Sequence, residues 1–310
     1  MPVARVNGIT LAYEEAGAGV PLLFVHEFVG DSKSWHLQVR FFARRYRTIT
    51  FNARGYPPSA VPPKETDYSQ DIAVEDIKGI LDNLKIDRAH ICGLSMGAYS
   101  TLNFGLRYPD RVLSLTLAGC GSGSFGDRAL FLTECRRAIE RFEQNDMQKV
   151  ADFYTMGPTR VQFRDKDPLG WQEFYDQFVV QSASGHALTM RGVQMKRPTI
   201  VELAPKFEKL DVPVLIIVGD EDDPCIESSI FMKRKMPAAG LIVIPKSGHA
   251  VNLEEPEIFN RELLNFLTAV ESKRWHRRNP MSIGGAGIFP VHLLEDQSET
   301  DGLAMTDNTR

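Results

Sequence analysis

The most informative stretch of this chain is Ala89–Tyr108, with the sequence AHICGLSMGAYSTLNFGLRY. Its apolar start, Ala89–Cys92, predicts a buried strand, and Ala98–Tyr108 predicts a helix. Between them, residues 93–97 read GLSMG, a G-x-S-x-G pattern that places a serine on a sharp turn from strand to helix. The flanking glycines permit the close backbone approach that such a turn needs. We therefore predict that the hydroxyl of Ser95 stands clear of the backbone and faces the N-terminus of the helix.

Further short runs of β-forming residues lie on both sides of this turn along the chain. Most are continuously apolar, as strands are when helices cover both faces of a parallel sheet. Helical patterns fall between them, which predicts a doubly wound, mostly parallel α/β sheet. The predicted strands are Ile9–Tyr13, Leu22–Val25, Thr48–Phe51, Ala89–Cys92, Val112–Ala118, Val214–Val218 and Leu241–Ile244.

A long strand-poor segment interrupts this alternation. We predict a core formed by residues 1–120 and 211–270, a helical cap inserted over 121–210, and a largely disordered polar tail over 271–310. The aromatic residues of the insertion could line a lid over a site, or could simply hold the insertion to the core. The helical candidates within it are Arg128–Glu143, Met147–Met156, Trp171–Ser184 and Thr199–Lys209.

The bulk composition excludes several classes of protein. The 310 residues are 43% hydrophobic and 25% charged, and the formal net charge of −4 provides no basic field for nucleic acid. No stretch approaches the roughly 18 apolar residues of a membrane helix, and the N-terminus lacks the pattern of an export signal. The four cysteines form no C-x-x-C pair, so a disulfide framework or a zinc site is not indicated. We expect a cytoplasmic protein that acts on a small molecule, of unknown oligomeric state.

A serine hydroxyl is a poor nucleophile at neutral pH and needs a nearby base, usually a histidine that a carboxylate orients. Of the seven histidines, His249 follows the last predicted strand, in a loop at the strand's carboxyl end, where α/β sites assemble. The loop after Val214–Val218 reads GDEDDP over 219–224 and offers four acids. The loop after Val112–Ala118 begins Gly-Cys-Gly and offers none. The orienting carboxylate is therefore predicted in the later loop.

With these features the chain resembles the α/β-hydrolases, in their esterase, lactonase and haloperoxidase-like branch. The resemblance covers about Val6–Val270. It rests on the serine turn, on the chain order of serine, acid and histidine, on NARGY over 52–56, and on Gly-His at 248–249 followed by EEP over 254–256.

The resemblance implies roles for further residues. In this family the acid usually stands three residues after the glycine that ends the strand, which implies Asp222, with Asp220 and Asp223 as alternatives. An oxyanion hole stabilises the negative charge that develops on a substrate carbonyl. The resemblance assigns it to the backbone N–H groups of Met96 and Phe28.

The loop that follows the second predicted strand departs from the family pattern. It reads HEFVG over 26–30, with Glu27 where the family usually has glycine, and His26 is expected to be structural. A carboxylate beside an oxyanion hole opposes the charge that the hole stabilises, unless the carboxylate is paired, protonated or turned away. Arg54 lies in the loop after the next core strand, so we expect a Glu27–Arg54 ion pair that fixes the N–H of Phe28. A simple exposed side chain and a direct catalytic role for Glu27 stay open.

The activity that the resemblance implies is hydrolysis of a carboxylic ester or lactone of a small, largely apolar substrate through an acyl-enzyme. Ser95 would attack, His249 would take its proton, and Asp222 would orient the imidazole, with no cofactor or metal. A carbon–carbon bond hydrolase and a cofactor-free perhydrolase use the same triad and stay open. A ligand receptor on the same fold is the alternative from another class.

Overall fold

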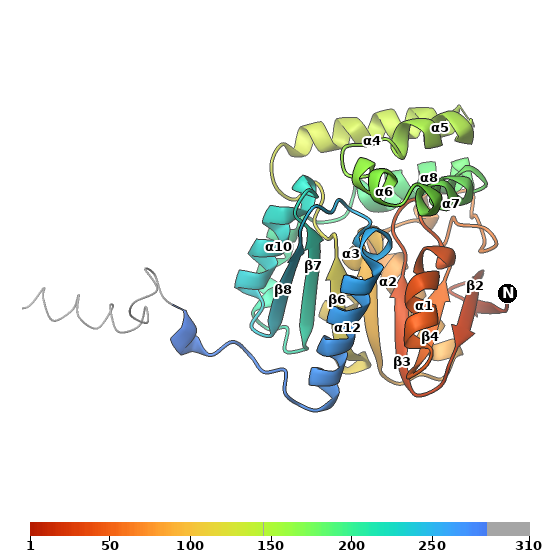
Figure 1. Cartoon of the computed structure of the whole chain (residues 1–310). Coiled ribbons are helices and arrows are strands. Elements are labelled where there is room, and N and C mark those ends of the chain that lie inside the picture. Colours follow the sequence, from red (N-terminus) through yellow and green to blue (C-terminus); the bar gives the residue numbers. More distant parts are fainter. Residues whose placement is uncertain (145, 284–310) are drawn as a thin grey trace, which may run out of the picture. The chain divides into compact units, whose positions relative to one another are not determined.

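The structure is a computed structural model that describes residues 1–144 and 146–283 (Figure 1). The chain divides into two units, 1–275 and 276–310. In the described part of the second unit, Pro280–Ser282 forms a 3-10 turn. The other elements belong to the first unit. No helix among the described residues is long and apolar enough to cross a membrane.

An eight-stranded sheet forms the middle layer of the first unit, in the order β1-β2-β4-β3-β5-β6-β7-β8. β2 pairs antiparallel with β1 and with β4, and all other neighbouring strands are parallel. This confirms the predicted doubly wound, mostly parallel α/β sheet. The sequence did not indicate β1, which is only four residues long. The strands are β1 Val3–Val6, β2 Ile9–Ala16, β3 Val20–Val25, β4 Tyr46–Phe51, β5 Ala89–Leu94, β6 Val112–Ala118, β7 Val214–Gly219 and β8 Ala239–Ile244.

Helices cover both faces of this sheet (Figure 1). One cluster of buried apolar side chains joins α2, α3, α9 and α10 to one face, and a second joins α1, α11 and α12 to the other. Because both faces are covered, β5 and β7 are buried along their whole length. The bounds of these helices are α1 His36–Phe42, α2 Gln70–Asn83, α3 Met96–Arg107, α9 Ile200–Phe207, α10 Asp223–Lys235, α11 Val251–Glu254 and α12 Pro256–Glu271.

α2 illustrates how the sequence sets a helix of this layer. The hydroxyl of Ser69 accepts a hydrogen bond from the backbone N–H of Ile72 and so caps the first turn. Val74, Ile77 and Leu81 recur at helical spacing and are fully buried against the sheet. Each such side chain contributes roughly 1.5 to 3 kcal/mol when it is removed from water. The apolar face, and not helix propensity alone, therefore holds α2 in place.

Between β6 and β7 the chain leaves the sheet and forms a helical insertion beside the carboxyl ends of the strands (Figure 1). The helix α9 was predicted as part of this insertion, but it packs beside α10 in the apolar cluster of the sheet. The remaining elements are α4 Arg128–Glu143, α5 Met147–Tyr154, α6 Val161–Lys166, α7 Pro168–Val179, α8 Ala183–Thr189 and a π-helical turn over Met190–Gln194.

Two details of the insertion differ from the sequence-based expectation. The single helix expected over Trp171–Ser184 is divided into α7 and α8, because Ser182 caps a new helix by accepting a hydrogen bond from the backbone N–H of Gly185. The short helix α6 was not predicted. Six residues, of which four are polar or charged, give too little apolar periodicity to indicate a helix.

A third apolar cluster joins the insertion to the loops at the carboxyl ends of the strands. From the core it includes Phe28, Tyr56 and Met96. Phe153 of the insertion is exposed. Six other aromatic residues of the insertion belong to this cluster, so they hold the insertion to the core. They are Tyr154, Phe163, Trp171, Phe174, Tyr175 and Phe178.

The residues after α12 still belong to the first unit as far as Trp275. Its indole lies edge-on to the ring of Phe266, with the ring centroids 4.6 Å apart, and its Nε1–H donates to the carbonyl of Ala238 at 2.8 Å. The tail was predicted to begin at residue 271, which here ends α12. The larger part of that tail, 284–310, lies outside the described residues.

Candidate active site

Ser95 lies on the turn between β5 and α3, in the left-handed region of the backbone at φ 54° and ψ −113°. A residue other than glycine in such a conformation costs on the order of 1 to 3 kcal/mol, which the surrounding structure must offset. The close packing is visible at the two flanking glycines. A Cβ at Gly93 would lie 2.4 Å from the carbonyl oxygen of Gly97, and a Cβ at Gly97 would lie 2.1 Å from that of Val25. The Ser95 side chain makes no capping hydrogen bond to α3, so its hydroxyl is available for chemistry.

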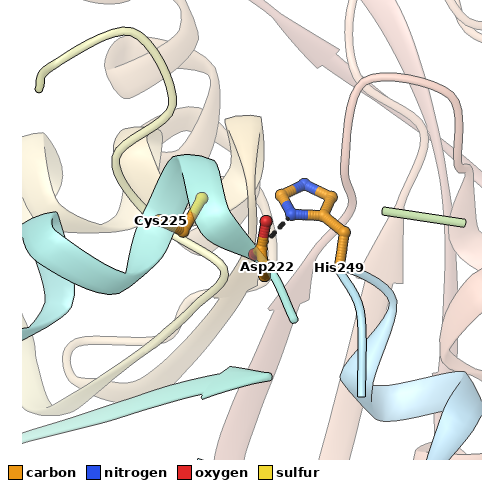
Figure 2. Close-up of side chains that lie close together, drawn as sticks. All are labelled: Asp222, Cys225 and His249. Carbon is orange, nitrogen blue, oxygen red and sulfur yellow. Dashed lines mark hydrogen bonds and ion pairs between the residues drawn. The ribbon is translucent and has the colours of Figure 1, made fainter. Parts of the chain in front are cut away.

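His249 and Asp222 form a buried hydrogen-bonded pair (Figure 2). The imidazole Nδ1 lies 2.7 Å from Oδ2 of Asp222, so Nδ1 donates and Nε2 is left to accept a proton. The ring packs against Gly119, where a Cβ would lie 3.2 Å from Nδ1 and from Cε1. Ala118 precedes Gly119, and its backbone carbonyl accepts a hydrogen bond from the backbone N–H of Ser95 at 2.8 Å. Ser95 and the imidazole of His249 therefore flank the same end of β6.

Asp222 is the one of the three candidate acids that bonds to His249. Asp220 and Asp223 are both exposed. Asp220 accepts a hydrogen bond from the backbone N–H of Ser247 at 3.2 Å instead. Asp222 is the residue just before α10, but its side chain makes no capping hydrogen bond to the helix. Its carboxylate bonds to the imidazole instead.

Two groups hold the loop that carries His249. The carboxylate of Glu254 accepts the backbone N–H groups of Gly248 at 2.7 Å and of Ala250 at 3.1 Å. Burial raises the pKa of this carboxyl above its usual value. The backbone N–H of His249 itself donates to the carbonyl of Thr159 in the insertion at 2.9 Å. The insertion thus takes part in positioning the candidate base.

The loop after β3 has the features that an oxyanion hole requires. Both nitrogens of His26 are engaged: Nε2 accepts the backbone N–H of Ala53 at 2.9 Å, and Nδ1 donates to the carbonyl of Glu27 at 2.7 Å. Burial also lowers the pKa of His26, which keeps the ring neutral. This arrangement suits a structural role. Within the described part of the chain, the backbone N–H groups of Phe28 and Met96 have no protein acceptor, so both are free to bind a substrate oxygen.

The predicted ion pair between Glu27 and Arg54 is wrong. Glu27 pairs with Arg160 of the insertion, whose Nη1 donates to Oε1 at 3.0 Å and whose Nη2 donates to Oε2. The two side chains are only 1% and 3% exposed. Arg54 turns to α2, where its Nε and Nη2 donate to Asp76 at 2.9 and 3.0 Å. The physical reason is that Asp76 is itself buried and needs a cation, whereas the side chain of Glu27 faces the insertion.

The sequence alone did not indicate a role for Arg160. It lies just before α6, 133 positions from Glu27 along the chain, and nothing in its neighbourhood distinguishes it from an exposed arginine. Its guanidinium also lies over the ring of Phe174, 5.4 Å from the centroid. Only the tertiary structure brings it to the loop of Phe28.

Asp222, His249 and Cys225 form the one group of potential metal ligands found among the described residues, with candidate ligand atoms within 4.8 Å of one another (Figure 2). Two observations favour a hydrogen-bonded cluster over a metal site. Nδ1 of His249 is already used by Asp222. Burial raises the pKa of the Cys225 thiol well above its usual value, and the thiol donates to the carbonyl of Gly119 at 3.3 Å. A metal would need the thiolate and the free imidazole nitrogen.

A small cavity of about 40 Å³ lies beside the oxyanion loop, lined among others by Tyr56, Met96 and Val193. Neither Ser95 nor His249 lines it. Pockets that hold small-molecule ligands usually measure about 300 to 1,000 Å³. At this size the cavity does not hold a small-molecule substrate.

The chain is similar in sequence to proteins of known function. A curated relative, the 3-oxoadipate enol-lactonase 1 of Acinetobacter baylyi, is 28% identical over 81% of this chain and 89% of its own. The 2-hydroxy-6-oxononadienedioate/2-hydroxy-6-oxononatrienedioate hydrolase of Burkholderia vietnamiensis is 29% identical over 82% of this chain and 90% of its own.

Solved structures agree with these relatives. A thermophilic esterase from Thermogutta terrifontis superimposes with a TM-score of 0.76 at 26% identity, covering 87% of this chain and 98% of the esterase. A model of the family described as alpha/beta hydrolase fold matches residues 20–256. The chain belongs to the alpha/beta hydrolase fold family.

Proposed function

We propose that this protein is a serine hydrolase that cleaves a carboxylic ester or lactone of a small, largely apolar substrate through an acyl-enzyme. The observation that carries the proposal is the placing of Ser95 on a strained, glycine-flanked turn, with the buried His249–Asp222 pair at the neighbouring strand end. The activities of the esterase from Thermogutta terrifontis and of the enol-lactonase from Acinetobacter baylyi agree with this reaction class.

The reaction follows from the roles of these groups. Oγ of Ser95 attacks the substrate carbonyl while Nε2 of His249 takes the hydroxyl proton. Asp222 stabilises the imidazolium through the Nδ1 hydrogen bond. The backbone N–H groups of Phe28 and Met96 hold the oxyanion of the tetrahedral intermediate. The intermediate collapses to the acyl-enzyme as the leaving oxygen receives the proton from the imidazolium, and water then repeats the sequence to release the acid.

A carbon–carbon bond hydrolase is the second candidate function. It is favoured by the relative from Burkholderia vietnamiensis, which is a hydrolase of 2-hydroxy-6-oxononadienedioate. The same three side chains would serve it, so the geometry of the site does not separate the two reactions.

A substrate panel of esters, lactones and dienoate diketones tests the proposal, with wild type and Ser95→Ala compared on each. Removal of the nucleophile should lower kcat on the order of a thousandfold or more. Ser100→Ala is the matched control, since Ser100 is a buried serine of the same helix whose hydroxyl accepts a hydrogen bond from Gln70 at 3.1 Å. Equal activity of wild type and Ser95→Ala would exclude the assignment, and tight binding without multiple turnover would indicate a receptor.

A further inference from the structure

Arg197, between the π-helical turn and α9, is a buried cation without a carboxylate partner among the described residues. Its side chain is 4% exposed. Nη2 donates to the backbone carbonyl of Ser122 at 3.0 Å, and the guanidinium carbon lies 3.7 Å from the centre of the Tyr99 ring. Nε and Nη1 are buried and have no hydrogen-bond partner within residues 1–144 and 146–283. Together these two nitrogens carry three unused N–H donors.

Three titratable side chains near this guanidinium, Tyr99, Cys120 and Cys135, carry no negative charge near neutral pH. Burial raises the pKa of Tyr99 to about 12, that of Cys120 to about 12 and that of Cys135 to about 11, although the nearby Arg197 opposes each increase. All three therefore stay neutral. An isolated buried charge is so costly that native proteins almost always pair it.

A second arginine adds to the positive charge at this junction. Arg128 of α4 donates to the backbone carbonyls of Gly123 at 2.9 Å and of Met195 and Arg197, each at 3.3 Å. Within the described part of the chain, neither Arg128 nor Arg197 forms an ion pair with a carboxylate. Arg128 and Arg197 thus bring two guanidinium groups to this junction, and neither has an ion pair among the described residues.

The place of Arg197 connects it to the candidate site. Its stacking partner, Tyr99, lies one helical turn after the nucleophile, and the backbone N–H of Tyr99 donates to the carbonyl of Ser95 at 3.0 Å. Its acceptor, Ser122, belongs to the same loop as Gly119, which packs against the imidazole of His249. Arg197 therefore contacts the two segments that flank the nucleophile and the base.

We propose that Arg197 binds a carboxylate of the substrate, so that the natural substrate is a small ester or lactone whose otherwise apolar body carries one free acid group. This inference rests on the proposed function and names its substrate class. The stacked Tyr99 ring and the bond to Ser122 hold the guanidinium in place before the ligand arrives, so little of its freedom is lost on binding. Because Arg197 is almost completely buried, a carboxylate bound to it is enclosed away from water, where a charge-assisted hydrogen bond is strong.

A matched pair of substrates tests the inference: mono-4-nitrophenyl glutarate, which carries a free carboxylate, and its methyl ester, which does not. Wild type should prefer the free acid. Arg197→Met should lower kcat/KM for the free acid on the order of ten- to a hundredfold, which corresponds to the loss of one hydrogen bond to a charged group. It should change kcat/KM for the methyl ester by no more than a few fold. Arg197→Lys should keep part of the preference. Arg137→Met removes an exposed charge from α4 and should change neither substrate.

A binding measurement separates this inference from the proposed function. Glutarate alone should raise the Tm of wild type and of Ser95→Ala, but not that of Arg197→Met. If wild type cleaves neither substrate while glutarate still stabilises it through Arg197, the hydrolase proposal fails and the carboxylate site stands. If wild type cleaves the methyl ester as well as the free acid and glutarate does not change its Tm, the carboxylate site is excluded and the hydrolase proposal stands.

Two further outcomes are decisive. Should Arg197→Met fail to fold, the preference of wild type and of Arg197→Lys for the free acid still decides the question. A chain that ends at Ile283 should show the same preference and the same response to glutarate. If glutarate binds only to this shortened chain and not to the full chain, the substrate assignment is overturned.

Discussion

Replacing Arg160 by methionine removes the only cation that pairs with Glu27 among the described residues. Burial opposes the charge on Arg160, but the carboxylate of Glu27 outweighs this effect and raises the pKa of the guanidinium above its usual range. Both charges are almost completely enclosed, and two hydrogen bonds join them. Arg160→Met would therefore leave a buried carboxylate without a partner beside Phe28.

The expected cost is about 3 to 5 kcal/mol of unfolding free energy, which is the usual penalty for removing one member of a buried pair. Glu27→Gln should cost a comparable amount for the same reason. The double variant should lose much less than the sum, because neither charge then remains unpaired. Since Glu27 precedes Phe28, the proposed oxyanion donor, kcat should fall in each single variant more than KM rises.

Urea unfolding and steady-state kinetics on the four proteins of this double-mutant cycle measure both effects. Arg164→Met is the matched control, because Arg164 also lies in the α6 segment but forms its ion pair with Asp165 at the surface. It should change the unfolding free energy by no more than about 1 kcal/mol. Additive losses in the double variant, or an Arg160→Met protein as stable as the control, would refute the reasoning.

The remaining predictions concern acid stability, the serine turn and the tail. Burial lowers the pKa of His186 from 6.5 to about 4, so the unfolded chain takes up this proton first as the pH falls. The unfolding free energy of wild type should therefore decrease by on the order of 3 kcal/mol between pH 6.5 and pH 4. Unfolding titrations should show a smaller decrease for His186→Gln, and equal decreases in the two proteins would contradict this explanation. Gly97→Ala should destabilise the protein and abolish ester cleavage, because its Cβ would collide with the carbonyl of Val25, and a fully active variant would show that the turn tolerates a side chain. A chain that ends at Ile283 should keep its kcat and Tm. A chain that ends at Glu271 should have a lower Tm, because it lacks Trp275 and the contacts of its indole. Activity and melting measurements on both shortened chains test this prediction.

The sequence predicted well those features that are encoded locally. The glycines around Ser95, the apolar run before it and the acids after β7 stand in short stretches, and parallel strands bring their carboxyl ends together whatever lies between them. Arg160 and Arg197 could not be found in this way. Each is functional in our proposals because it is buried, and burial of a charged side chain depends on contacts far along the chain. The pairing of Glu27 failed for the same reason, since the sequence offered Arg54 at the expected strand end but did not show that Asp76 already bound it.

The hydrogen bond from the backbone of His249 to Thr159 has a consequence for attempts to re-engineer substrate preference. Exchange of the segment 121–210 with that of a relative is the obvious route to a new specificity, and we expect it to change the substrate profile. A transplanted segment must also supply a carbonyl at the place of Thr159 and a cation for Glu27. A graft chosen only for the shape of its pocket would lose both contacts, and the recipient loops that carry Phe28 and His249 would lose their supports. Donor segments should therefore be selected first for these two polar contacts, and only then for the side chains that face the substrate.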